Sequence, residues 1–154
     1  MGKIISFANQ KGGVGKTTSA VNIAASLGVL GYKVLLIDLD PQGNATSGVG
    51  LMKKNLKNTI FEVLTTDLPA EDAIIQTHFD NLSIIPTHTT LARAEYELGD
   101  TENGEYVMKK KLAKAKETYD YIIIDCPPSL GMLTVNSMTA SDGVVIPVQC
   151  EFLA

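Results

Sequence analysis

The chain is poor in the residues that build disulfide frameworks and metal clusters. Its 154 residues include two cysteines and two histidines. Cys126 and Cys150 each lie in or beside an apolar run and form no C-x-x-C pair. We therefore expect two buried thiols rather than a disulfide or a metal site. His78 and His88 stand apart from other ligand types, which indicates structural or surface roles.

Long apolar runs and an excess of positive charge are also missing. No apolar run reaches the roughly 18 to 20 residues that span a bilayer, and the apolar stretch in MGKIISFANQ is too short for a secretion signal. A net charge of -4 and a pI of about 5.1 exclude a polycation. Nucleic-acid contact would therefore need a local basic patch or a further part of the protein. We expect a cytoplasmic protein with no membrane partner.

Short apolar runs alternate with helical patterns along the chain. The apolar runs predict strands at residues 3–8, 33–38, 82–86, 121–125 and 143–148. The helical patterns predict helices at residues 16–30, 59–65, 70–77, 90–98, 104–118 and 130–140. The runs KVLLID and YIIID are nearly continuous, as in parallel strands that are covered on both faces. The alternation favours an α/β fold, a doubly wound and mostly parallel sheet with helices on both faces.

The chain length suits one domain, and the sequence shows no internal repeat, low-complexity tract or linker. The sequence stops at VQCEFLA, directly after an expected strand and on apolar residues. Few helices remain to cover the second face of the sheet. We therefore expect residues 1–154 to be a single domain that is truncated at its C-terminus, the N-terminal fragment of a longer domain.

A glycine-rich segment, NQKGGVGKTT, follows the first expected strand and opens the first expected helix. This order is typical of phosphate-binding loops. Glycines let the backbone approach closely, and the N–H groups of residues 13–18 would point at phosphate oxygens beside the positive end of the helix. Lys16 would contact the terminal phosphates and Thr17 would hold Mg²⁺. The predicted nucleotide-binding residues are Lys11, Gly12, Gly13, Val14, Gly15, Lys16, Thr17 and Thr18.

The loop departs from the usual G-x-x-x-x-G-K-[ST] pattern at two positions. Gln10 stands where the first glycine is usual, and Lys11 adds a second lysine. Phosphoryl transfer gains from an extra positive charge, which a neighbouring chain often delivers. We predict that Lys11 is such a charge, donated across a dimer interface. A solvated surface lysine is the alternative.

Three aspartates follow or end expected strands. Asp125 ends YIIID and would hold Mg²⁺ through water at the crevice outside the carboxyl ends of the strands; capping of the turn before Pro127 is the alternative. Asp38 and Asp40 lie two residues apart in LLIDLDPQGN and would share one face of an extended chain. Either would orient the attacking water, and we favour Asp40 because it lies beside the loop. Capping of that loop is the alternative for both.

Three segments, KGGVGKTT, DLDPQGNAT and IIIDCPPSLG, together resemble the ParA/Soj partition ATPases, within the deviant Walker-A group that includes MinD. The resemblance covers nearly the whole chain. It implies a P-loop NTPase fold and a slow ATPase that uses ATP and Mg²⁺. It also implies an ATP-dependent homodimer that binds DNA nonspecifically on the nucleoid, and a ParB-like centromere-binding partner that stimulates hydrolysis. Such proteins segregate chromosomes or plasmids.

The resemblance assigns roles to single residues. Lys11 is the lysine that reaches the partner's nucleotide in a sandwich dimer, and Thr18 supports the α-phosphate. Asp40 activates the water, Asp125 is the switch residue beside Mg²⁺, and Asp38 is an outer partner of Mg²⁺. The catalytic prediction is therefore Lys11, Lys16 and Asp40, and the metal prediction is Thr17, Asp125 and Asp38.

The resemblance also bears on regulation and on completeness. Loops 39–48 and 126–131 are the predicted switches between ATP and ADP states. Family members are longer at the C-terminus, where most residues for DNA binding lie. The resemblance therefore allows for an isolated fragment that is inactive.

Three other functions share parts of these motifs. A MinD-like membrane-associated ATPase in division-site placement would need an amphipathic C-terminal helix. A reductase similar to the nitrogenase iron protein would need cluster-ligating cysteines at an interface. A ligase of the dethiobiotin synthetase type would need a pocket for a substrate carboxylate. The segment DCPPSLG is more similar to the ParA side.

Lysines gather in two clusters outside these motifs. For both we expect a solvated helix face, with nonspecific DNA contact as the alternative. The clusters are Lys53, Lys54 and Lys57, and then Lys109, Lys110, Lys111, Lys114 and Lys116.

Overall fold

The computed structural model describes residues 1–152, and a six-stranded sheet forms their centre. The strand order is β3-β4-β2-β5-β1-β6. The parallel strands are β1 (Lys3–Phe7), β2 (Val34–Asp38), β4 (Leu82–Ile85), β5 (Tyr121–Asp125) and β6 (Gly143–Val145). The edge strand β3 (Ile75–Gln76) pairs with β4 antiparallel. This mostly parallel sheet confirms the predicted α/β fold.

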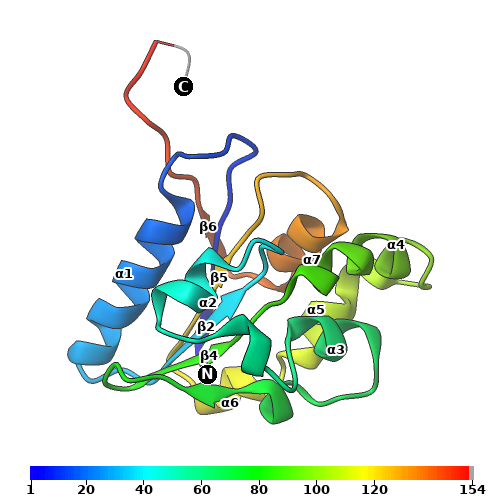
Figure 1. Cartoon of the computed structure of the whole chain (residues 1–154), viewed down its shortest axis with the longest axis horizontal. Coiled ribbons are helices and arrows are strands. Elements are labelled where there is room, and N and C mark those ends of the chain that lie inside the picture. Colours follow the sequence, from blue (N-terminus) through cyan, green and yellow to red (C-terminus); the bar gives the residue numbers. More distant parts are fainter. Residues whose placement is uncertain (153–154) are drawn as a thin grey trace.

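Helices cover both faces of the sheet (Figure 1). One face carries α1 (Lys16–Val29) and α2 (Asn44–Gly48). The other carries α3 (Ile60–Thr65), α4 (Ala94–Gly99), α5 (Val107–Lys111), α6 (Ala115–Thr118) and α7 (Met132–Ala140). Short 3₁₀ turns are η1 (Lys53–Asn55), η2 (Ala70–Ala73), η3 (Thr89–Arg93) and η4 (Gly104–Tyr106). Within residues 1–152, no helix has the length and apolarity that crossing a membrane requires.

Alternation along the central strands explains why both faces are packed. Side chains of a strand point in turn to opposite faces. In β2, Leu35 and Ile37 pack with the helices α3 to α7, whereas Leu36 packs with α1. Ala20 and Ala24 are the buried small residues that let α1 lie close to the sheet. The continuous apolar run of β2 therefore serves two cores at once.

Residues 70–77 do not form the predicted helix. Residues 70–73 make one 3₁₀ turn, and Ile75 then pairs with Ile84 at the edge of the sheet. Asn81, with a φ of 55°, closes the hairpin between these strands. The helical prediction was wrong because pairing with β4, which sequence periodicity does not report, decided the conformation.

The predicted helix at 104–118 is broken into η4, α5 and α6. Met108, Leu112 and Ala115 are all buried, at spacings of four and then three residues. These are the spacings of one face of a continuous helix. A tighter turn between α5 and α6, in which the N–H of Ala113 bonds to the carbonyl of Lys110, interrupts the regular helix. The segment therefore buries the helical face expected from the sequence, although the helix is divided.

Two further expectations fail near the C-terminus. Strand β6 ends at Val145 rather than at residue 148, because its pairing with β1 ends at Phe7. Cys150 is exposed, whereas Cys126 is buried as expected. The exposed position of Cys150 follows from its place in the segment after β6, which projects from the body of the molecule (Figure 1).

Candidate functional site

The segment between β1 and α1 forms a loop at the carboxyl ends of the parallel strands. Gly13 and Gly15 have φ values of 69° and 89°, in the left-handed region that glycine adopts without strain. A Cβ on Gly13 would meet no atom within 4 Å, so backbone conformation rather than crowding requires glycine there. Gly15 directly precedes α1, whose first N–H groups therefore open towards the loop.

A cleft of about 310 Å³ lies over this loop and joins three separate segments of the chain. The glycine loop, the loop after β2 and the loop after β5 all contribute. Its lining residues are Gly12, Gly13, Gly15, Lys16, Thr17, Thr18, Asp40, Gln42, Asn44 and Pro128. Backbone N–H groups at a helix N-terminus, a lysine and two hydroxyls suit a phosphate chain. Gln42 and Asn44 lie in the predicted switch loop 39–48 but had no individual role, and the fold brings them to the glycine loop.

The two lysines of the loop occupy different environments. Lys16 is 6% exposed, and its Nζ donates to the backbone carbonyl of Lys11 at 3.0 Å. The side chain of Lys11 is exposed at the rim, and its backbone N–H donates to Asn9 Oδ1 at 3.0 Å. Val14 is buried, so its contribution to a ligand would come from its backbone. Lys16 therefore points into the loop, and Lys11 lies at its edge.

Thr17 and Asp125 meet at the inner end of the cleft. Thr17 Oγ1 donates to Asp125 Oδ2 at 2.6 Å. The other oxygen, Oδ1, is buried and has no hydrogen-bond partner among residues 1–152. Burial raises the pKa of Asp125 to about 7, against the bond from Thr17, and the nearby Asp38 raises it further. A hydroxyl and a carboxylate oxygen that still needs a partner fit the oxygen ligands of Mg²⁺.

Asp38 is also buried, but both of its oxygens accept hydrogen bonds. Oδ2 accepts from the N–H and the Oγ1 of Thr46, each at 2.7 Å, and Oδ1 accepts from the N–H of Asp40 at 3.2 Å. Burial raises its pKa to about 6. Thr46 Oγ1 also accepts from the N–H of Thr87 at 3.1 Å. Asp38 therefore fastens the loop after β2 to the sheet.

Asp40 is the acidic residue that lines the cleft. Its Oδ1 accepts from the N–H of Gln42 at 3.0 Å, and its carbonyl accepts from the N–H of Gly43 at 2.8 Å. These bonds fix the carboxylate over a tight turn. Of the three predicted aspartates, Asp40 is thus at the cleft wall, and Asp38 and Asp125 are fully buried.

Glu95, which sequence reasoning missed, holds the loop after β5. Its Oε2 accepts from the N–H of Met132 at 2.5 Å and from that of Leu133 at 3.4 Å, and so caps α7. A Cβ on Gly131 would collide with this carboxylate. The sequence gives no signal of this contact, because Ser129 directly precedes the predicted helix at 130–140, whereas the observed α7 begins at Met132 with Gly131 as its N-cap and no side-chain cap. A helix without its own cap needs an acceptor from elsewhere.

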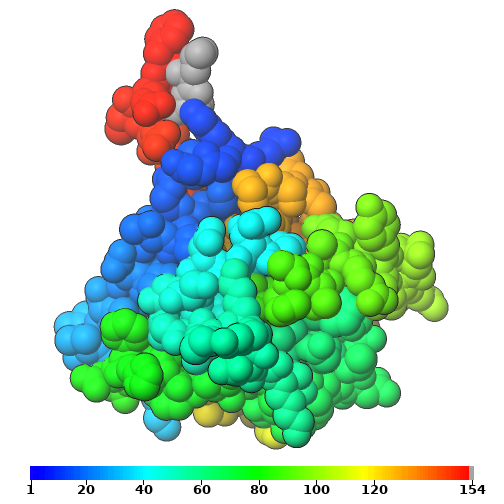
Figure 2. Space-filling view, in the orientation of Figure 1, coloured from blue at the N-terminus to red at the C-terminus, as the bar shows by residue number. Residues whose placement is uncertain are grey.

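The segment after β6 lies beside the glycine loop at one end of the molecule (Figure 2). Gln149 Nε2 donates to the carbonyl of Gly13 at 3.0 Å, and Asn9 Nδ2 donates to the carbonyl of Pro147 at 2.8 Å. The segment after β6 is therefore joined to the glycine loop by two side-chain hydrogen bonds.

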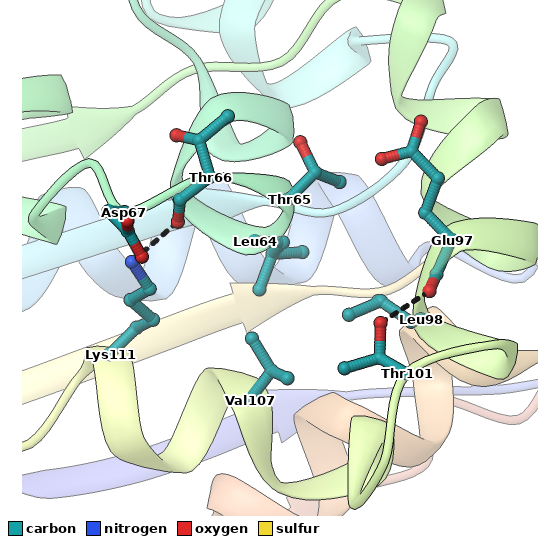
Figure 3. A pocket seen from close by; sticks show the side chains of 9 residues that line it. All are labelled: Leu64, Thr65, Thr66, Asp67, Glu97, Leu98, Thr101, Val107 and Lys111. Carbon is teal, nitrogen blue, oxygen red and sulfur yellow. Dashed lines mark hydrogen bonds between the residues drawn. The ribbon is translucent and has the colours of Figure 1, made fainter.

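The larger cavity lies elsewhere, between α3, α4 and α5 (Figure 3). Its volume is about 520 Å³, and its lining includes Leu64, Val107 and Lys111. It shares no residue with the cleft over the glycine loop. Cavity size therefore does not locate the chemistry here, and the convergence of predicted residues does.

Comparison with known proteins identifies the family. The family model described as AAA domain matches residues 2–154. The chain is 54% identical to the sporulation initiation inhibitor protein Soj of Bacillus subtilis, with all of this chain and 61% of Soj aligned. It is 48% identical to the chromosome partitioning protein ParA of Myxococcus xanthus, again over its full length and over 54% of that protein. The chain thus spans less than two thirds of these relatives.

Solved structures share the fold over the same length. A cobyrinic acid a,c-diamide synthase from Mycobacterium smegmatis with bound ADP and magnesium is 44% identical, with a TM-score of 0.95 over the whole chain and 62% of that protein. A plasmid partition protein from Borrelia burgdorferi bound to AMPPNP is 35% identical, with a TM-score of 0.87 over the whole chain and 64% of that protein. The glycine loop, the strand-end aspartates and these similarities lead to one conclusion. The chain belongs to the AAA-domain family and, within it, to the ParA/Soj family.

Proposed function

We propose that residues 1–154 form the nucleotide-binding part of a longer ParA/Soj-type domain that binds and hydrolyses ATP with Mg²⁺. The observation that carries the proposal is the pair at the end of the glycine loop. Thr17 bonds to Asp125, and the second carboxylate oxygen of Asp125 is buried without a partner among residues 1–152. The solved relatives that are named with ADP, an ATP analogue and magnesium support the same ligands.

The glycine loop binds the phosphates in this scheme. The backbone N–H groups of residues 13–18 donate to phosphate oxygens, and Thr18 supports the α-phosphate. Lys16 moves its amine from the carbonyl of Lys11 to the terminal phosphates. Thr17 and Asp125 hold Mg²⁺, which when bound neutralises charge on the phosphate oxygens. Asp38 acts on the site indirectly, because its carboxylate holds the backbone of Asp40 in place.

Hydrolysis needs a positioned water and a second positive charge. Asp40, at the wall of the cleft, orients the water and accepts its proton. Lys11, at the rim, supplies its charge to the nucleotide of a second copy of the chain. The reaction is slow because the site is completed only in the dimer. A ParB-like partner accelerates it in the cytoplasm, where the ATP-bound dimer associates with the nucleoid.

Two loops respond to whether ATP or ADP is bound. Loop 39–48 carries Asp40 and Gln42, and loop 126–131 runs from Asp125 to the Glu95-capped start of α7. Both change conformation between the ATP and ADP states. The ATP-bound dimer binds DNA nonspecifically, and this cycle segregates a chromosome or a plasmid.

Three variants of the full-length protein test this scheme by sedimentation with and without ATP. Lys16→Ala should abolish ATP binding. Lys11→Ala should still bind ATP but neither dimerise nor hydrolyse. Asp40→Ala should bind ATP and persist as a dimer, because hydrolysis no longer ends that state. A persistent Asp40→Ala monomer in the presence of ATP would contradict the proposal.

A small-molecule synthase is the second candidate, favoured by the name of the M. smegmatis structure. The two candidates differ in what accelerates hydrolysis. A partition switch responds to DNA and to a centromere-binding partner. A synthase responds to its small acidic substrate and leaves DNA unbound. Assaying hydrolysis with each addition separates them.

A further inference from the structure

A third cavity, with a distinct chemistry, lies beside the loop that follows β2. Its volume is about 210 Å³. We call it the basic pocket, and its polar lining includes Lys53, Lys54, Lys57, Thr59, His88 and Thr90. Three lysines within five residues surround this cavity, although the chain as a whole carries a net charge of -4. A local field of this kind attracts anions regardless of overall charge.

One carboxylate also lines the basic pocket, but it is already engaged. Glu62 Oε2 accepts from the N–H of Thr59 at 2.7 Å and from Thr59 Oγ1 at 2.6 Å. These bonds form the capping box at the start of α3. The carboxylate is thus held by the N–H and hydroxyl of Thr59, and among residues 1–152 it forms no ion pair with a lysine. The hydroxyl proton of Thr59 is engaged by the same carboxylate, so the excess of donors in the pocket comes from its lysines.

The basic pocket is joined to the nucleotide cleft by one hydrogen bond. Lys53 Nζ donates to the backbone carbonyl of Gln42. Gln42 lines the cleft over the glycine loop, and Lys53 lines the basic pocket. The stem of Lys53 lies over Gly43, where a Cβ would collide with it. The contact between Lys53 and Gln42 therefore separates the basic pocket from the nucleotide cleft and is part of the lining of both.

The second lysine cluster of the sequence is used differently. Lys111 Nζ donates to the carbonyl of Thr66 at 2.8 Å (Figure 3). It also donates to the carbonyl of Leu68 at 3.0 Å, and so ties α5 to the end of α3. Lys116 pairs with Asp142 at 2.8 Å. Part of that cluster therefore stabilises the fold, whereas the three lysines near η1 line one cavity together. Of the two clusters, the one at residues 53–57 is arranged as a site.

We propose that the basic pocket binds phosphate groups of a nucleic-acid backbone and that this binding acts on the nucleotide loop through Lys53 and Gln42. Lysine, threonine hydroxyl and imidazole groups are typical donors to backbone phosphates, which carry no sequence information. A phosphate that draws the amine of Lys53 into the pocket takes it from the carbonyl of Gln42. Nucleic acid and nucleotide then alter each other's affinity by the same factor. The inference rests on the proposed function, because it names the residues with which the proposed ATP-dependent switch would contact DNA.

The double variant Lys54→Gln/Lys57→Gln in the full-length protein tests the site. A fluorescent duplex of arbitrary sequence is titrated with ATP present, over about 50 to 200 mM salt. The slope of log affinity against log salt should fall by about 1 for each lysine removed. The matched control is Lys109→Gln/Lys110→Gln, an equal charge change on exposed α5 residues, for which the slope should stay as in the wild type. ATP affinity without DNA should be unchanged in both variants.

Lys53→Met tests the connection, because it removes the amine and keeps a stem over Gly43. In the wild type, duplex DNA should change the dissociation constant for ATP. In Lys53→Met that fold-change should shrink towards 1. If DNA changes the dissociation constant for ATP by the same factor in Lys53→Met as in the wild type, the coupling through Lys53 and Gln42 is overturned.

The outcomes separate this inference from the function on which it rests. A wild-type protein that binds DNA and hydrolyses ATP, with an unaltered salt slope in Lys54→Gln/Lys57→Gln, overturns the pocket and leaves the switch intact. Binding to vesicles with anionic lipids instead of DNA, lost in the same variant, overturns the nucleic-acid assignment. A wild type that binds no ATP removes the proposed function itself.

Discussion

Two aspartates at the ends of neighbouring strands share almost every property except their partners. Asp38 of β2 and Asp125 of β5 are paired in register, both are fully buried, and burial raises the pKa of both. Asp38 accepts three hydrogen bonds that engage both oxygens. Asp125 accepts one, from Thr17, and its other oxygen has no partner within residues 1–152. Burial and charge therefore do not distinguish Asp38, which holds a loop in place, from Asp125, which is the candidate Mg²⁺ ligand. The number of hydrogen bonds that each carboxylate accepts does distinguish them.

The largest expected effect is on hydrolysis, and it separates the two aspartates directly. In the full-length protein, Asp125→Asn should lower the rate of ATP hydrolysis by about 100-fold and raise the Mg²⁺ concentration needed, because the amide is a poorer ligand for a hard cation. Asp38→Asn should lower the rate by about 10-fold at most, since it acts only through the position of Asp40. Steady-state assays across Mg²⁺ concentrations measure both. Equal losses in the two variants would erase the distinction.

The next effect is on stability, and here the order of the two residues reverses. Asp38→Ala leaves the N–H and hydroxyl of Thr46 and the N–H of Asp40 without their buried acceptor. We expect the free energy of unfolding to fall by about 2–4 kcal/mol. Asp125→Asn, which keeps an acceptor for Thr17 and removes a buried charge, should not lower it. Urea denaturation without nucleotide, at an unchanged m value, measures both changes. An Asp38→Ala protein as stable as the wild type would show that Asp38 is not an anchor.

The sequence was sufficient to place these aspartates because strand ends and loops are local patterns. YIIID and KVLLID specify buried parallel strands, and the carboxyl ends of parallel strands meet at one edge of the sheet. The glycine loop is equally local, since Gly13 and Gly15 fix its backbone conformation. The sequence therefore predicted which residues gather at the edge, although not which oxygen of each would be satisfied.

Contacts between distant segments escaped prediction. Glu95 caps α7 from 37 residues away, and β3 replaces a predicted helix because it pairs with β4. Lys54 and Lys57 are exposed, as expected for a solvated face, but the sequence did not predict that the fold would place His88 and Thr90 beside them. In each case tertiary packing, not local propensity, determines the role of the residue.

A smaller effect appears in the pH dependence of stability. The pKa of Asp125 is raised to about 7 in the folded protein, against about 3.9 in the unfolded chain. Between these values the folded state holds a proton that the unfolded state has lost, so stability falls as pH rises and levels off above the folded-state pKa. Asp38, with a pKa of about 6, completes its titration earlier. Between about pH 6 and 7 the decline therefore belongs mainly to Asp125.

Asp125→Asn should remove that decline, because the amide does not titrate. The expected difference between wild type and variant is about 1 kcal/mol of unfolding free energy across that interval. Urea denaturation at a series of pH values, without nucleotide or Mg²⁺, measures it. The two histidines are present in both proteins, so their contribution cancels in the difference. Parallel pH profiles for the two proteins would mean that Asp125 is ionised throughout.

The smallest expected effect concerns the hydroxyl that joins Asp38 to the end of β4. Thr46 Oγ1 donates to Asp38 and accepts from the N–H of Thr87. Thr46→Val keeps the shape but removes both bonds, and we expect a loss of about 1–2 kcal/mol. Thr46→Ser keeps the hydroxyl and should lose less than half as much, as thermal or urea denaturation would show. If serine costs as much as valine, the methyl packing of Thr46 and not its hydroxyl secures the loop, and the anchoring role of Asp38 rests on the Thr46 and Asp40 backbone bonds alone.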